Sequence, residues 1–183
     1  MLQITIPSAE MWDERKQEFV YSKEQKLSLE HSLISVSKWE SKWCKPWYQT
    51  FSKNGATTEE TIDYVRYMTL TQNVDPYVYN FLTNENIKQV SDYIQAPMTA
   101  TWFSDDEKGK SNREVITNEL IYYWMIALQI PFECQKWHFN RLLTLIRVCN
   151  VKNKPPKKMS KREIISRNAA LNAARRKRLN TTG

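Results

Sequence analysis

Residues 116–150, ITNELIYYWMIALQIPFECQKWHFNRLLTLIRVCN, decide the fold class of this chain. The first part is the most apolar segment of the sequence, and its large side chains recur every three or four positions, at Ile116, Leu120, Tyr123, Trp124 and Ala127. Pro131 suits the first turn of a following helix, and the same spacing continues at Cys134, Trp137, Arg141, Leu142, Leu145 and Cys149. The pattern predicts two consecutive helices that form a core hairpin and end near Asn150. A capping box at residues 111–114 should begin the first of them.

Helix start signals precede this segment. From Ser32 onward, Val36, Trp39 and Trp43 have helical spacing, which should end at Lys45 and Pro46 and give way to a loop that reaches Gly55. Thr57 and Glu60 form a capping box ahead of Ile62, Val65 and Met68. Asp75 with Pro76, and then Thr83, predict two further starts, and the second of these helices should stop before Pro97.

The N-terminus has a different period. Leu2, Ile4 and Ile6 alternate with polar residues, as in a half-buried strand, and residues 18–21 could be its partner. The sequence therefore predicts a mainly α fold: a compact helical domain with a small N-terminal β element.

The formal net charge of +7 is unevenly distributed. Residues 152–183 contain eleven lysines and arginines and one acid, whereas residues 1–151 contain 16 bases and 19 acids. Prolines and lysines at 153–158 disfavour a helix, and Ser160 with Glu163 resembles a capping box ahead of an alanine-rich stretch. We predict a helical domain over residues 1–151 and a basic, conditionally helical tail over residues 152–183.

Composition excludes several protein classes. With 41% hydrophobic and 26% charged residues, the chain is typical of a globular protein and not of a disordered one. Cys44, Cys134 and Cys149 are too few and too widely spaced for a disulfide framework or a zinc knuckle, which favours a reducing compartment. The longest apolar run is too short to span a bilayer, so no membrane association is expected.

The candidate catalytic motifs are incomplete. Residues 109–111 resemble the end of a phosphate-binding loop, but Ser104 stands where that loop needs glycine, and three acids at 105–107 would repel a triphosphate. Those acids could instead bind a divalent cation or form a solvated loop tip, and the second interpretation is favoured. Cys134 and His138 could pair on one helix, yet a zinc site needs more ligands, and His31 beside Glu30 has no nucleophile. Glu59, Glu60 and Asp63 fit the first turn of a helix. We predict no catalytic residue, no cofactor and no metal.

Binding residues are better represented. Trp39, Trp43 and Trp47 lie four apart, and two interpretations stay open: Trp39 and Trp43 in the core with Trp47 at an edge, or a hydrophobic docking patch for another chain. The tail bases could bind nucleic-acid phosphates or an acidic protein, or belong to a solvated extension. The tentative partner-binding residues are Trp39, Trp43, Trp47, Lys157, Lys158, Arg175, Arg176, Lys177 and Arg178.

Four stretches carry a family resemblance: LEHSLISVSKWES at 29–41, TATWF at 99–103, IPFECQKWH at 130–138 and LNAARRK at 171–177. Together they resemble small proteins encoded among the virion assembly genes of tailed bacteriophages, and the description that fits best is tail assembly chaperone. The resemblance implies a non-catalytic protein of the host cytoplasm that binds the tape-measure protein and helps tail-tube subunits gather around it. The alternatives are a head–tail connector, neck or tail protein of the virion, and a nucleic-acid-binding protein acting through its tail. A homo-oligomer is also possible.

Overall fold

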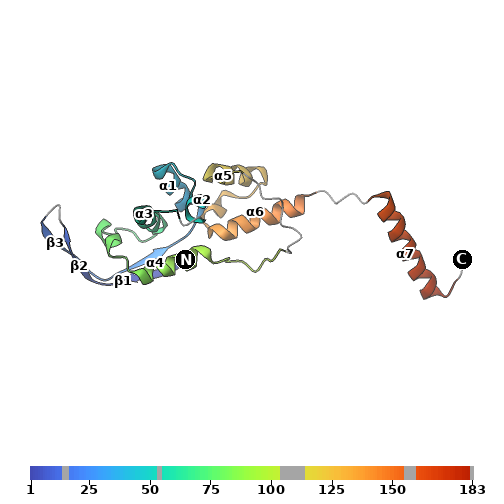
Figure 1. Ribbon diagram of the computed structural model, residues 1–183, viewed down its shortest axis with the longest axis horizontal. Helices are drawn as coiled ribbons and strands as arrows, with labels where there is room; N and C mark the ends of the chain where they lie inside the picture. Colours follow the sequence, from blue (N-terminus) through green and yellow to red (C-terminus); the bar gives the residue numbers. More distant parts are fainter. Residues whose placement is uncertain (14–16, 53–54, 104–113, 155–159, 182–183) are drawn as a thin grey trace. The chain divides into compact units, whose positions relative to one another are not determined.

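A computed structural model describes residues 1–13, 17–52, 55–103, 114–154 and 160–181. The protein is mostly helical with small N-terminal strands, as the sequence predicts (Figure 1). The chain divides into two units, residues 1–150 and 151–183, which are taken in turn below.

Four strands open the first unit: β1 (Leu2–Ile6), β2 (Ala9–Asp13), β3 (Glu18–Ser22) and β4 (Gln25–Leu29). β1 pairs with β4 and β2 pairs with β3, both antiparallel. The residue-to-residue pairing of one ladder continues into the other without a shift. They therefore form a single long hairpin that is interrupted where Pro7, which has no N–H to donate, separates β1 from β2. The predicted pairing of residues 18–21 with β1 is wrong, because those residues pair with β2, a strand that the sequence analysis missed.

The predicted helix starts upstream are confirmed. α1 (Leu33–Trp43), α3 (Thr58–Met68) and α4 (Asn84–Gln95) each begin with a capping box, formed by Ser32, Thr57 and Thr83 with the residue three positions later. Asp75 caps η1 (Pro76–Phe81), a 3₁₀ helix. The predicted loop up to Gly55 is wrong in part, because α2 (Trp47–Ser52) follows directly after Pro46.

The segment that suggested a helical hairpin contains α5 (Asn118–Ala127), a short 3₁₀ helix η3 (Phe132–Lys136) and α6 (Phe139–Asn153). The capping-box residues 111–113 lie outside the described residues, and α5 starts only at Asn118. The buried side of α5 carries Ile121 and Met125, whereas Tyr123 of the predicted stripe is exposed. Nearly every position of α5 is apolar, so periodicity could not select its buried face. Pro131 opens η3 and not α6, whose buried residues are Phe139, Leu142 and Ile146.

The buried carboxylate of Glu40 on α1 supplies two helix starts with a hydrogen-bond acceptor. Its Oε1 accepts from the backbone N–H of Trp47 at 2.7 Å, and its Oε2 accepts from the backbone N–H of Asn118 at 2.8 Å and from the Asn118 amide at 2.6 Å. Thr117, the residue before α5, makes no side-chain cap of its own. One side chain therefore caps both α2, which begins seven residues later, and α5, which begins 78 residues later.

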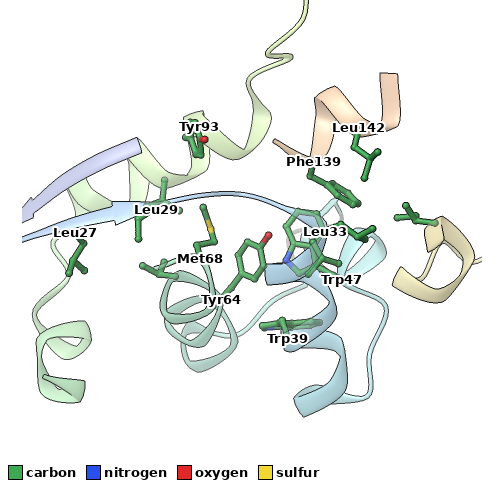
Figure 2. Close-up of a cluster of buried hydrophobic side chains, with 14 of the residues drawn as sticks. Leu27, Leu29, Leu33, Trp39, Trp47, Tyr64, Met68, Tyr93, Phe139 and Leu142 are labelled. Carbon is green, nitrogen blue, oxygen red and sulfur yellow. The ribbon is translucent and has the colours of Figure 1, made fainter. Parts of the chain in front are cut away.

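The core lies between the inner half of the hairpin, β1 and β4, and the helices. Figure 2 shows Met68 and Tyr64 in the middle of the cluster, with Leu27 and Leu29 on one side of them and Trp47 on the other. Backbone hydrogen bonds connect residues 28–32, at the end of the hairpin, to two helices. The N–H of Glu30 donates to the carbonyl of Met68, at the end of α3, and the N–H of Phe139, at the start of α6, donates to the carbonyl of His31. The end of β4 is thus held by segments about 40 and 110 residues further along the chain.

The second unit contains α7 (Lys161–Leu179), which begins with a capping box of Ser160 and Glu163 and ends at Asn180 in the left-handed region. No residue of α7 is buried. Across the part of the chain that the structure describes, no helix has the length and apolar character needed to cross a membrane.

Candidate functional site

The three tryptophans that sequence analysis selected occupy different environments. Trp39 is fully buried and donates its indole N–H to the carbonyl of Glu60 at 3.0 Å. Trp47 is also buried in the core, because the left-handed Cys44 ends α1 and α2 then brings Trp47 back over it. The expectation that Trp47 covers an edge is wrong. Trp43 is half-buried and donates its indole N–H to Asp63 at 3.1 Å. Because Trp39 and Trp47 are buried, neither offers a surface to a partner.

Trp47 lies beside a buried aromatic and histidine cluster. The His31 ring centroid is 5.0 Å from the ring centroids of both Trp47 and His138, and 5.3 Å from that of Phe139. His31 Nδ1 and the Tyr64 hydroxyl share a 2.6 Å hydrogen bond, and His138 Nε2 donates to the carbonyl of Tyr93 at 3.0 Å. Sequence analysis treated His31 as structural and did not foresee that His138, 107 residues away, would contact it.

Burial and, to a smaller extent, the neighbouring His138 together lower the pKa of His31 to about 3. Its Nε2 has no hydrogen-bond partner among the described residues, so nothing there stabilises a second ring proton. Burial also lowers the pKa of His138, and burial raises the pKa of Tyr64. All three groups are therefore neutral near pH 7, which favours a packing role over proton transfer.

This cluster predicts acid-sensitive stability. Between pH 6.5 and about 3, an unfolded His31 binds a proton that the folded protein excludes, so stability falls as the pH is lowered and is unaffected by His31 above that window. We expect a loss of about 2 kcal/mol between pH 7.5 and 5. Urea unfolding across this range measures it. His31→Gln removes the titrating group and should flatten the profile; an unchanged slope would contradict the assignment.

A cavity of about 640 Å³ adjoins the cluster, between α2 and α4. His31, Trp47 and Phe51 line it on one side and Ile87, Val90 and Ile94 of α4 on the other. The described residues that line it are apolar or neutral and polar, and they include serine and threonine hydroxyl groups but no acid, lysine or arginine.

The other candidate chemical groups have structural partners. Cys134 lies in η3 and His138 precedes α6, so they do not share one α-helix, and burial raises the pKa of the Cys134 thiol. Glu30 accepts a hydrogen bond from the Tyr93 hydroxyl at 2.7 Å and does not pair with His31. Within the described ranges, no three His, Cys, Asp or Glu side chains are grouped to hold a metal ion. Residues 105–107 and 109–111 lie outside those ranges.

The carboxylates at the start of α3 also serve the fold. Glu60 accepts from the backbone N–H of Thr57 and pairs with Lys45 at 2.6 Å, while Asp63 pairs with Lys42. Because these acids already neutralise lysines of the same domain, they form a structural network and not a cation site.

A row of exposed aromatic residues, which the sequence patterns did not predict, lies on the outer half of the hairpin, β2 and β3. Trp12 on β2 and Phe19 on β3 are directly opposite each other, with ring centroids 5.0 Å apart, and Tyr21 follows at 6.5 Å from Phe19. We call Glu10, Trp12, Phe19 and Tyr21 the hairpin face. Glu10 and Trp12 are two positions apart, and so are Phe19 and Tyr21. This spacing of two could have revealed the face, had residues 9–13 been recognised as a strand.

The tail bases lie on an exposed helix. Arg176, Lys177 and Arg178 occupy the last turn of α7, where positive charge interacts favourably with the C-terminal end of the helix dipole, and Arg175 directly precedes them. The other two predicted tail residues, Lys157 and Lys158, lie outside the described residues. The sequence matches no protein-family model, and neither the curated proteins nor the solved structures include one that it matches.

Proposed function

We propose that this chain is a non-catalytic binding protein of phage tail assembly, a chaperone that keeps the tape-measure protein soluble while tail-tube subunits gather on it. The family resemblance supplies this function. The observation that carries the binding role is α7, a helix of 19 residues with none of them buried.

A partner that packs against α7 would stabilise a helix of this kind. Most helical stability in proteins comes from packing one face of the helix, and no residue of α7 is buried. Ile164, Leu171 and Leu179 are exposed and are seven and eight residues apart, about two helical turns each, so they lie on one side of α7. Seven bases against one acid add long-range attraction to an acidic partner. α7 thus suits an acidic, partly apolar segment of the tape-measure protein.

The test is co-expression with the tape-measure protein of the same phage. We expect the full-length chain to keep at least several times more tape-measure protein in the soluble fraction than a form that ends at Asn153. Replacing Arg175, Arg176, Lys177 and Arg178 with glutamine should lose most of that effect. A matched control replaces four exposed lysines of the first unit, Lys23, Lys26, Lys38 and Lys88.

The outcomes separate the candidate functions. Equal solubility with and without α7 would overturn the docking role, and no rescue by the full chain would overturn the chaperone proposal. Presence in mature virions by mass spectrometry would favour a connector, neck or tail protein instead.

The charge of α7 favours nucleic acid as a second candidate partner. Binding through its bases would weaken steeply with added salt and would not depend on nucleotide sequence. Titration of labelled DNA across a salt series, with the full chain and with the form ending at Asn153, distinguishes this candidate. Tight, α7-dependent binding at physiological salt would place nucleic acid ahead of the tape-measure protein.

A further inference from the structure

The hairpin face belongs to the first unit of the chain, whereas α7 belongs to the second. In the β2–β3 ladder, Glu10 is opposite Tyr21 and Trp12 is opposite Phe19. Directly opposite residues share a side of the ribbon, and so do residues two positions apart along a strand. Three aromatic rings and one carboxylate therefore form one continuous face.

The rings of this face are open to solvent. Trp12 is 49% exposed, Phe19 54% and Tyr21 71%. Among the described residues, the cations that lie over aromatic rings do so at Trp43, Trp137 and Phe103 and not on this face. Elsewhere in the protein, aromatic rings do have cations over them. The Arg141 guanidinium is 4.3 Å from the Trp137 ring centroid, and that of Arg147 is 3.9 Å from the centroid of Phe103.

The area of the face argues against a second copy as its partner. Aromatic side chains bury about 150–250 Å² each when fully covered. Because these three are already partly covered, two copies meeting face to face would bury roughly 450–750 Å² of aromatic surface in total, below the ~1,200 Å² of stable interfaces. The face is better matched to a few side chains of a peptide segment.

The charge of the face selects the chemistry of that segment. Aromatic rings attract a guanidinium or ammonium over their faces, and a nearby carboxylate adds its own Coulomb attraction to the cation. Glu10 is exposed, adjoins Tyr21 across the ladder and forms no ion pair with the described residues. We propose that the hairpin face binds an arginine- or lysine-bearing segment of a partner protein, with the cationic side chains over Trp12 and Tyr21 and next to Glu10.

Binding of two matched peptides to the full-length chain tests the proposal. One is a short synthetic peptide of alternating glycine and arginine, and the other has citrulline, which keeps the shape of arginine without its charge. We expect calorimetry at low salt to show about five- to tenfold tighter binding of the arginine peptide. Equal affinity for the two peptides would overturn the proposal.

Variants locate the binding. Trp12→Leu and Tyr21→Leu keep apolar side chains and remove the rings, and each should abolish most of the preference for arginine; Glu10→Gln should reduce it about twofold to threefold. Trp102→Leu is the matched control, because Trp102 is 92% exposed and outside the hairpin. Circular dichroism verifies that each variant folds. If Trp12→Leu disturbs the hairpin, the result for Tyr21→Leu decides the test. An unchanged preference in Tyr21→Leu, or an equal loss in Trp102→Leu, would refute the assigned face.

Discussion

Replacing Glu40 with alanine should lower the free energy of unfolding by about 3–5 kcal/mol. Glu40 accepts three hydrogen bonds, two of them from the backbone N–H groups at the starts of α2 and α5. Alanine leaves both backbone N–H groups buried without an acceptor, whereas the Asn118 amide keeps its 2.9 Å bond to Glu119, and each unpaired buried group costs about 1–3 kcal/mol. The loss is large because one side chain serves two helices.

Urea unfolding at pH 7 measures this loss. Glu40→Gln should cost about 2 kcal/mol, because its oxygen can still accept at one helix start while its NH₂ group meets an N–H donor at the other. Glu85→Ala is the control, since Glu85 is an exposed acid on α4 and its replacement should change stability by less than about 0.5 kcal/mol. Equal stability of Glu40→Ala and Glu85→Ala would show that water satisfies the two helix starts.

Trp39→Ala should be comparably destabilising, by about 3–5 kcal/mol. The side chain is fully buried, stacks on Trp43 with ring centroids 6.3 Å apart and meets Phe51 edge-on at 5.4 Å. Alanine would leave a cavity between α1, α2 and α3 and remove the hydrogen bond to the carbonyl of Glu60.

Two variants separate these contributions to Trp39. Trp39→Phe keeps most of the volume and loses the indole N–H, and should cost about 1–2 kcal/mol. Trp102→Ala, at an exposed tryptophan, should cost less than about 0.5 kcal/mol. Thermal unfolding followed by circular dichroism ranks the three variants, and a loss in Trp102→Ala as large as that in Trp39→Ala would contradict this account.

The features that sequence reasoning predicted correctly are local. The capping boxes at Thr57 and Ser160 need only residues three positions apart, so their patterns identified the starts of α3 and α7. The strand β1 has a clear period of two. Its partner could not be identified in this way, because pairing depends on the register of the whole hairpin, which residues far from β1 determine.

The features that sequence reasoning missed depend on distant residues. α5 starts where Glu40, 78 residues earlier, meets Asn118, and no local motif contains that information. The contact between His31 and His138 likewise exists only once β4 and α6 meet. The exposed hairpin face was missed for a different reason: the aromatic residues were judged by helical spacing, and Trp12 and Phe19 belong to strands.

The backbone bonds at residues 28–32 have a consequence for the order of synthesis. Ribosomes release a chain from its N-terminus, and β4 is complete long before its partners. Leu27 and Leu29 stay without their cover until α3 emerges, and His31 remains without Phe139 until α6 does. The first unit therefore cannot close its core during translation until almost all of its residues have left the ribosome, and over that interval its N-terminal strands are open to aggregation or to capture by chaperones.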